Sequence, residues 1–461
     1  MWVSLQHFDC KILGTLQILF KQLCCERIQK NAQNSESKIS IKFFLLKSIG
    51  KSILLIIPNR GLGGAQRVFH DHSVALREFY DVTEAIFNED EADVYPSGNV
   101  VHSLGVSGGG GILAKISNFW KRVQRLRLLK QELQCDVAIS HLEGADYVNL
   151  LSKGQEKTII LIHGSKQHDK AIKGALGMLR KRLLMPALYN RADKIVTVSR
   201  DINPELIEAF GVKPEKLQTI NNFFEVSQIQ TRAHEPLSTA EQAVYAAGPV
   251  LVTSGRLTPQ KNQAPLLDVF AQVQQQQPTA KLVFVGDGEL RDALIARARG
   301  LGLRVFAAWE SAVITPDYDV YFLGLQANPF KYLRPATAFV FPSAWEGFPM
   351  ALGEAMACGL PVLSADCPTG PREMLAPATA TPTVPLGQAE TGSYGLLLPM
   401  LTQPATLAAH QAVWVAALGT LLASSAEQRR LGQLAQQRME DFTRERIFGQ
   451  WVQLIEEVRR G

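Results

Sequence analysis

Two successive series of short apolar runs, separated by stretches with helical periodicity, constrain the fold of this sequence most. The first series consists of KSILLIIPN (51–59), DVTEAIFN (81–88), DVAISHL (136–142), TIILIHG (158–164) and KIVTVS (194–199). The second consists of PVLVTSG (249–255), KLVFVGDG (281–288), VYFLG (320–324), AFVFPS (338–343) and PVLSAD (361–366). Strands of a parallel sheet are buried on both faces and therefore read as continuous apolar runs. The alternation with helices, for example at 115–134 and 171–190, predicts an α/β protein with two Rossmann-like, doubly wound domains.

Chain length and breaks in composition divide the 461 residues further. A chain of this length usually forms more than one domain. We expect an extension at 1–48 without chemistry of its own, a domain at 49–237, a linker or surface hairpin at 238–248, a second domain at 249–440 and a terminal helix at 441–461 that packs back towards the first domain. Two segments, 304–320 and 376–392, read as insertions.

Composition excludes several classes of protein. Hydrophobic residues make up 46% of the chain and charged residues 20%, which is typical of a globular protein. The net charge of +5 is mild, because 43 acidic residues offset 48 basic ones, so we expect no nucleic-acid partner. Six cysteines without a CxxC pair indicate reduced thiols in the cytoplasm.

Membrane contact is left open by the sequence. The apolar piece 12–20 is shorter than the roughly 20 residues that a spanning helix needs, and it lacks the features of a signal peptide. Two basic segments, 115–130 and 178–186, interleave cations with Trp, Phe and Leu, which suits a helix that lies against anionic lipid or, equally, a solvated helix face. We expect a cytoplasmic protein, with contact at the inner face of the cytoplasmic membrane as an open alternative.

A pair of glutamates gives the first chemical signal. Glu346 and Glu354 flank a Gly-Phe-Pro turn between the run 338–341 and the predicted helix MALGEAMAC, with Pro349 in the first helical turn. The amides at the helix N-terminus would then face the carboxyl end of the sheet, where anions and ligands bind. A carboxylate there can accept two hydroxyl groups of a sugar or ribose. The alternative is one charge that favours the helix dipole and one solvated surface residue.

Two cations stand at the end of a neighbouring predicted strand. Arg256 and Lys261 lie in SGRLTPQKNQ (254–263), directly after the run that begins the second series. Guanidinium and ammonium groups at such a position can neutralise a diphosphate. Taken alone, such residues are usually ordinary surface cations.

The order of these motifs resembles a known family. SGRLTPQKN, LVFVGDGEL, YFLGLQANPFKYL and SAWEGFPMALGEAMACGLPVLSADC are similar to the retaining nucleotide-sugar glycosyltransferases of family 4, the group 1 enzymes with the GT-B fold, in which two domains face each other across a cleft. The resemblance implies that Arg256 and Lys261 hold the pyrophosphate of the donor, Glu346 contacts the donor sugar and Glu354 contacts the nucleotide ribose. It also implies donor contacts at Gly255, Gly286, Asp287, Gly347, Phe348, Pro349 and Met350.

The N-terminal half resembles the family more loosely. In RGLGGAQRVF, Gly63 and Gly64 match a glycine loop that lets the backbone approach the pyrophosphate. A dinucleotide fingerprint fails there, because Gln66 occupies the third glycine position. His163, at the end of the run 158–162, matches a histidine close to the donor sugar, although a lone histidine is more often structural.

The sequence indicates less clearly which residues contact the acceptor. Ser199 in VTVSRD and the INN sequence (220–222) match family positions near the hinge and the acceptor, and Glu143 in SHLEGAD is a weaker candidate for acceptor contact.

The resemblance also implies a reaction and its partners. The acceptor hydroxyl would attack the face from which the nucleotide leaves, and the leaving pyrophosphate would take its proton. No Asp-x-Asp sequence lies at the expected place, so we expect no metal and no cofactor. The donor would be a UDP-sugar, and the acceptor a glycan or a lipid-linked sugar of surface polysaccharide synthesis. Two alternatives remain: a UDP-sugar epimerase of the same fold, which lacks this glutamate spacing, and a non-catalytic sugar-nucleotide-binding subunit.

Overall fold

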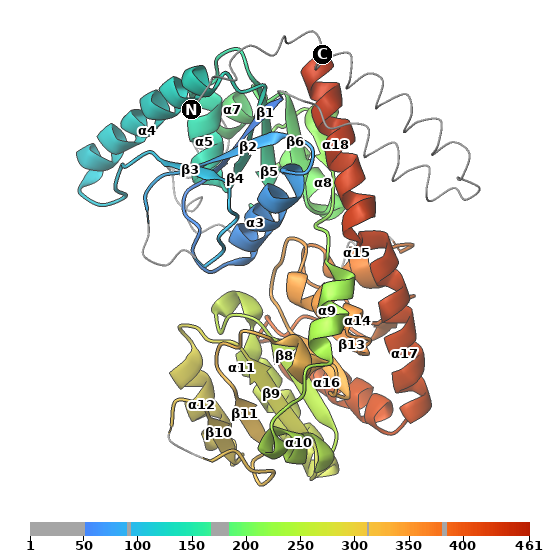
Figure 1. Cartoon of the computed structure of the whole chain (residues 1–461). Helices are drawn as coiled ribbons and strands as arrows, with labels where there is room; N and C mark the ends of the chain where they lie inside the picture. The colour runs from blue at the N-terminus through green and yellow to red at the C-terminus, as the bar shows by residue number, and fades with distance from the viewer. Residues whose placement is uncertain (1–50, 90–93, 167–183, 311–312, 380–384) are drawn as a thin grey trace, which may run out of the picture.

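The structure is a computed structural model of the chain that describes residues 51–89, 94–166, 184–310, 313–379 and 385–461. Two α/β domains, each a sheet with its covering helices, lie one above the other, and the C-terminal helices run along one side of both (Figure 1). We call them the N-terminal layer and the C-terminal layer. The expected extension 1–48 and most of the basic segment 178–186 lie outside the described residues, as does most of the helix expected at 171–190.

The N-terminal layer is a seven-stranded parallel sheet with the order β3-β2-β1-β4-β5-β6-β7. Its strands are β1 Ser52–Ile57, β2 Asp81–Ile86, β3 Val100–Ser103, β4 Val137–His141, β5 Lys157–Ile162, β6 Lys194–Thr197 and β7 Leu217–Thr219. Its helices are α3 Gly64–Leu76, α4 Ile112–Leu133, α5 Glu143–Leu151, α7 Met185–Tyr189 and α8 Asn203–Glu208, with short 3-10 turns at Arg200–Ile202 and Pro214–Lys216.

The C-terminal layer is an eight-stranded sheet with the order β10-β11-β9-β8-β12-β13-β15-β14, parallel except for the edge pair β14–β15. Its strands are β8 Val250–Ser254, β9 Lys281–Val285, β10 Val305–Ala307, β11 Val320–Phe322, β12 Ala338–Phe341, β13 Val362–Ala365, β14 Glu390–Thr391 and β15 Leu396–Leu398. Its helices are α9 Val226–Ala233, α10 Thr239–Ala246, α11 Gln263–Gln276, α12 Arg291–Gly300, α13 Phe330–Leu333, α14 Met350–Ala357, α15 Pro371–Leu375, α16 Leu407–Leu422 and α17 Ser425–Arg438, with 3-10 turns at Pro259–Lys261 and Met439–Phe442. The last helix, α18 Arg444–Arg460, lies against the N-terminal layer.

All ten apolar runs form strands, and the strands that the sequence does not reveal lie at or near sheet edges. β3 and β7 carry half-exposed or exposed side chains and therefore have no continuous apolar run. Within the segment 304–320, expected as an insertion, β10 is instead an edge strand of the sheet, and Arg304 pairs with Asp319 at 2.6 Å. The segment 376–392 likewise contributes β14, where Arg372 pairs with Glu390 at 2.8 Å.

The segment expected as a linker or hairpin forms helix α10 instead. Ser238 accepts a hydrogen bond from the Glu241 amide at 3.3 Å, and the Glu241 carboxylate accepts one from the Ser238 amide at 2.8 Å. This reciprocal capping satisfies two amides that would otherwise lack partners and so fixes the start of a helix.

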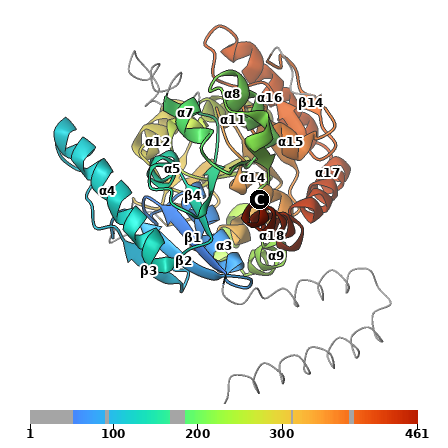
Figure 2. The ribbon, with the colours of Figure 1, turned by 90° about the horizontal axis from the view of Figure 1, so that it is seen from above.

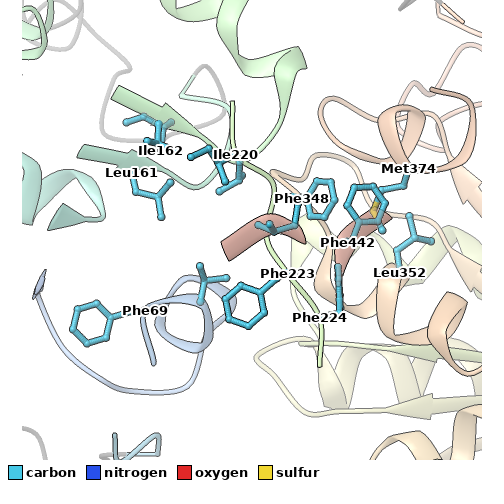
Figure 3. Packing of buried hydrophobic residues seen from close by; sticks show 14 of the residues in the cluster. Phe69, Leu161, Ile162, Ile220, Phe223, Phe224, Phe348, Leu352, Met374 and Phe442 are labelled. Carbon is cyan, nitrogen blue, oxygen red and sulfur yellow. The ribbon is translucent and has the colours of Figure 1, made fainter. Parts of the chain in front are cut away.

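Aromatic packing joins the two layers. Phe348 lies between Phe224 and Phe442, with ring centres at 6.3 Å and 5.1 Å (Figure 3). Helix α18 then crosses to the N-terminal layer, where Trp451 packs against His72 at 4.8 Å and Glu456 pairs with Lys51 at 2.9 Å. Contacts of the last helix with the first layer therefore hold the two layers together.

No single helix in the described part of the chain is long and apolar enough to cross a bilayer. Helices α16 and α17, taken with the 3-10 turn after α17, would pass such a test as a pair, but they are bent by 102° at their junction.

Candidate active site

A cavity of about 380 Å³ lies between the two layers, at the carboxyl ends of both sheets. The turns that follow β1, β5, β8, β9 and β12 all contribute to its wall. Every residue that the sequence assigns to catalysis or to the donor lines this cavity: Gly63, Gly64, His163, Gly255, Arg256, Lys261, Gly286, Asp287, Glu346, Gly347, Phe348, Pro349, Met350 and Glu354.

Two helices from different layers begin at the cavity. α3 starts at Gly64, and α14 starts at Met350, and neither has a side chain that caps its first amides. Pro349 is the residue before the first turn of α14 and not, as expected, within that turn. The partial positive charge of both helix ends therefore points into one space, which favours an anion there.

Lys261 and Glu346 form a close ion pair in the cavity wall. The Lys261 ammonium lies 2.6 Å from a Glu346 carboxylate oxygen, and the side chains are only 16% and 6% exposed. Gln260 donates to the Trp345 carbonyl at 2.9 Å, which ties the turn that carries Lys261 to the turn that carries Glu346.

Arg256 differs from Lys261 because its side chain is exposed to the cavity. Its guanidinium makes no hydrogen bond or ion pair with the residues that the structure describes. Lys261 is thus already paired, whereas the donors of Arg256 are available to a ligand.

Glycines bring the loops of the C-terminal layer into close contact. Gly286 has a φ of 142°, and a Cβ on it would lie 2.1 Å from the Gly255 carbonyl oxygen. Because any larger residue would separate these two turns, the glycines define the floor of the cavity.

The two layers meet most closely at Gly347. A Cβ on Gly347 would lie 1.8 Å from the His163 carbonyl oxygen and 3.0 Å from the Gly164 Cα. Thr369 donates its hydroxyl hydrogen to this turn, with the Glu346 carbonyl oxygen at 3.0 Å and the Gly347 carbonyl oxygen at 3.1 Å. The turn after β12 is therefore held against the end of β5, and the contact leaves no room for a side chain at position 347.

Glu354 sits in the first turns of α14 and faces charged groups from α3. Burial raises the pKa of the Glu354 carboxyl to about 7, and the nearby Arg67 opposes this rise. Arg67 is itself held by Asp71, with 3.1 Å between Arg67 Nε and the nearer carboxylate oxygen.

Arg67 and Tyr95 also line the cavity, although sequence reasoning missed both. Arg67 lies one turn into the helix that follows Gly63 and Gly64, so helical spacing from those glycines gave a usable signal for it. Tyr95 lies in an irregular segment that carries no such signal.

His163, in the cavity wall, contacts the buried His141, which does not line the cavity. His163 Nε2 and His141 Nδ1 lie 3.1 Å apart, so one ring N–H donates a hydrogen bond to the other ring. Burial lowers the pKa of His163 to about 3 and that of His141 well below its ordinary value, so both rings are neutral at physiological pH. His141, at the end of β4, was not singled out from the sequence.

Of the residues expected near the acceptor, Ser199 and Glu143 do not line this cavity, whereas Asn222 of the INN sequence does. Ser199 is buried and donates to Glu373 at 2.6 Å. Glu373 also accepts from the Arg200 amide at 3.0 Å and from Asn221 at 2.9 Å, so it connects the two layers. Glu143 accepts a short hydrogen bond from the Tyr147 hydroxyl and lies 3.7 Å from the Lys166 ammonium.

Comparisons with known proteins agree with this arrangement. The solved structure of Anabaena HepE in complex with UDP-glucose has a TM-score of 0.66 and 19% identity, and the match covers 88% of this chain and 99% of that one. The fold is that of the GT-B glycosyltransferases, with two Rossmann-like domains facing each other across a cleft.

Models of protein-family sequences match most of this chain and identify its family. The model "Glycosyltransferase Family 4" matches residues 62–228, and the model "Glycosyl transferases group 1" matches residues 248–391. The chain belongs to the group 1 glycosyltransferases.

This chain matches different shares of the length of two related proteins. An uncharacterized glycosyltransferase of Methanocaldococcus jannaschii is 32% identical over 56% of this chain and 62% of that protein. The N-acetylgalactosamine-N,N'-diacetylbacillosaminyl-diphospho-undecaprenol 4-alpha-N-acetylgalactosaminyltransferase of Campylobacter jejuni is 25% identical over 69% of this chain and 82% of that protein.

Proposed function

We propose that this protein is a retaining glycosyltransferase that moves a hexose or N-acetylhexosamine from a UDP-sugar to a glycan or lipid-linked acceptor in surface polysaccharide synthesis in the cytoplasm. One observation carries the proposal: two helix N-termini without capping side chains, three cations and three carboxylates converge on a single cavity between the two layers. A sugar nucleotide combines a diphosphate with several hydroxyl groups. The diphosphate suits the cations and helix N-termini, and the hydroxyl groups suit the carboxylates.

The diphosphate would lie between the start of α14 and the two cations of the C-terminal layer. Arg256 has free donors that can form two parallel bonds with phosphate oxygens, and Lys261 adds a point charge beside them. Both groups stabilise the negative charge that develops on the departing nucleotide, and a fixed dipole or cation at such a point is worth about 3 kcal/mol in the transition state.

The carboxylates would hold hydroxyl groups. Glu354 has a pKa of about 7, so roughly half of it is charged near neutrality. Two ribose hydroxyls that donate to the charged form would lower this pKa and complete the ionisation. Glu346 would accept from the donor sugar while it orients Lys261.

Transfer would proceed on one face of the sugar. The acceptor oxygen forms a bond to the anomeric carbon as the bond to the pyrophosphate oxygen breaks, and the leaving pyrophosphate receives the acceptor proton. Neutral His163 would contact a sugar hydroxyl without introducing charge. No carboxylate nucleophile is required on this account.

We propose that the reaction needs no metal. Within the described ranges, no group of three or more His, Cys, Asp or Glu side chains is placed to hold a metal ion. Activity that persists in excess EDTA would support this point, and activity that returns only with Mg²⁺ or Mn²⁺ would overturn it.

The printed names of relatives support the choice of substrates. The Campylobacter relative is named for the transfer of N-acetylgalactosamine to a diphospho-undecaprenol-linked sugar, and Anabaena HepE was crystallised with UDP-glucose. Both are compatible with a UDP-sugar donor, and the first with an acceptor on a lipid diphosphate.

A panel of UDP-sugars tests the proposal. We expect UDP to be released from one of them together with transfer of its sugar, and Arg256→Ala to cut turnover about 10²-fold. Arg299→Ala is a matched control, because Arg299 pairs with Glu310 on the surface and does not line the cavity. An epimerised donor without transfer would indicate the isomerase, and tight binding without turnover would indicate the non-catalytic subunit.

A further inference from the structure

A second cavity, of about 560 Å³, lies at the amino edge of the N-terminal sheet. The ends of α4 and α18 and the residues that lead into β4 and β5 line it. Lys157 in its wall and His163 in the wall of the first cavity are six residues apart on extended chain, or about 20 Å. The end of α18 lies on the side of the N-terminal layer that faces away from the C-terminal layer (Figure 1) and, seen from above, beside its strands (Figure 2). We call this space the second cavity.

A buried ion pair forms one part of its wall. The Lys130 ammonium lies 2.7 Å from a Glu156 carboxylate oxygen, and the side chains are 2% and 4% exposed. Lys130 also donates to the backbone oxygen of Asn149 at 2.9 Å and to its side-chain oxygen at 2.7 Å. All three donors of this ammonium are therefore used, and the charges of the pair cancel. Burial raises the pKa of the Cys135 thiol, which also lines the second cavity, to about 12, so this group is neutral as well.

Three further cations line the second cavity and keep donors for a ligand. The Lys157 ammonium makes no hydrogen bond or ion pair with the residues that the structure describes. Arg127 donates from one nitrogen to the Leu151 carbonyl at 2.8 Å, and Arg459 pairs through one nitrogen with Glu456 at 3.0 Å. The Nε of Arg459 is buried and has no hydrogen-bond partner in the described part of the chain. Such a group calls for a bound anion or water.

The lining of the second cavity is positive overall. Four cations and two carboxylates line it, so its net charge is +2. Asp136, the carboxylate outside the buried pair, lies between two of the cations: its backbone oxygen accepts from the Lys157 amide at 2.9 Å, and its carboxylate is 3.8 Å from Arg459 Nε. One of its carboxylate oxygens already accepts from the Ser52 amide at 2.9 Å. The other oxygen is left to accept a hydroxyl group, while Lys157 and Arg459 flank a place for an anion.

Uncharged polar side chains complete the lining. Gln131, Gln134 and Gln155 contribute amides, which both donate to and accept from hydroxyl groups. The volume lies within the range of sites for small molecules. A ligand that fills the second cavity should therefore combine an anionic group with several hydroxyl groups.

We propose that the second cavity binds a phosphorylated sugar. Lys157, Arg127 and the free Nε of Arg459 hold its phosphate group, since guanidinium and ammonium groups form strong charge-assisted bonds with phosphate oxygens. The glutamines and Asp136 bind its hydroxyl groups. Because the ligand contacts both α18 and the starts of β4 and β5, it ties the last helix to the N-terminal sheet and stabilises the folded chain. This site does not depend on the proposed function.

Calorimetry of the full chain in phosphate-free buffer tests the proposal. The probe is glucose 6-phosphate, whose phosphate is not on the anomeric carbon and which therefore mimics a sugar-nucleotide donor poorly. We expect it to bind, inorganic phosphate to bind more weakly and glucose not to bind, and we expect the probe to raise the unfolding temperature. Lys157→Gln, which breaks no contact of the folded chain, should raise the Kd of the probe about tenfold. The matched control is Arg460→Gln, because Arg460 is exposed next to Arg459 and does not line the second cavity.

Several results would overturn the proposal. One is a chain that neither binds glucose 6-phosphate nor is stabilised by it, and another is a Lys157→Gln variant that binds the probe as tightly as Arg460→Gln. Equal and weak binding of glucose 6-phosphate, inorganic phosphate and sulfate would mean an adventitious anion only.

UDP separates the second cavity from the cavity between the layers, which also contains cations. Binding of glucose 6-phosphate should persist in saturating UDP and in Arg256→Ala, and UDP affinity should be unchanged in Lys157→Gln. Displacement of the probe by UDP would mean that it binds in the cavity between the layers, against the proposal. Absent UDP binding with intact binding of glucose 6-phosphate would contradict the proposed function alone.

Discussion

Replacement of Lys261 by methionine tests the central ion pair of the cavity. Methionine keeps most of the length of the stem but removes the charge that lies 2.6 Å from Glu346. Glu346 is only 6% exposed, so its carboxylate would remain buried without a counter-charge. Breaking one side of such a buried pair costs about 3–5 kcal/mol. We expect Lys261→Met to unfold at a clearly lower urea concentration than the wild type.

A second change separates stability from function. In the double variant Lys261→Met, Glu346→Gln the buried charge is gone, so stability should return to within about 1 kcal/mol of the wild type. Affinity for the UDP-sugar should not return, because neither the ammonium nor the carboxylate is present. Unfolding followed by tryptophan fluorescence and donor binding by calorimetry measure the two properties on the same samples.

The reasoning would be refuted by either of two outcomes. One is a Lys261→Met protein whose unfolding midpoint equals that of the wild type, which would mean that Glu346 finds water or another partner. The other is a double variant that is no more stable than Lys261→Met, which would mean that packing and not charge determines the loss.

Three further perturbations have defined outcomes. Gly347→Ala should force the two layers apart and lower turnover about 10²-fold. The control Gly300→Ala, whose added methyl group meets open space, should leave turnover unchanged. Equal turnover of the two variants would contradict the close contact at Gly347. The raised pKa of Glu354 means that the folded state holds the carboxyl proton more tightly than the unfolded state. In thermal unfolding, the stability of the wild type should therefore fall relative to that of Glu354→Gln as pH rises from about 4.5 through 7. Parallel curves of stability against pH for the two proteins would refute this. His141→Leu should slow transfer about tenfold yet leave UDP affinity intact, because only the orientation of the His163 ring is lost; His141→Asn, which can still hydrogen bond, should recover part of the rate.

The sequence predicted the buried strands well because their physical signal is strong. Runs such as SILLII in β1 and KLVFV in β9 are buried almost throughout, and no other element of that length needs such a pattern. The edge strands β3 and β7 escaped detection because their side chains are half-exposed or exposed and form no continuous apolar run. β14 has only two residues, and the three buried apolar residues of β10 lie in a segment that was read as an insertion. The helix at 239–246 was missed because its segment was read as a linker or hairpin, although Ser238 and Glu241 have the spacing of a capping box.

That the expected catalytic and donor residues would gather at one cavity was also predictable from the sequence, whereas Arg67, Tyr95 and the pairings within the cavity were not. Parallel strands end at one edge, so turns that follow them must gather there. That Lys261 would bind Glu346, or that Gly347 would touch the His163 backbone, depends on how two layers approach each other. Contacts across 85 residues or between layers leave no local pattern in the chain.

The return of α18 to the N-terminal layer has a consequence for synthesis on the ribosome. His72 and Phe79 on α3 and its following turn are covered by Trp451 and Phe448, which are among the last residues to be made. At about 5–20 residues per second, the 225 residues from the end of β7 to Arg444 take about 11–45 s to make, and the first layer waits that long for the helix. During this interval its apolar flank is open, and a chain that stops before Arg444 would keep it open permanently.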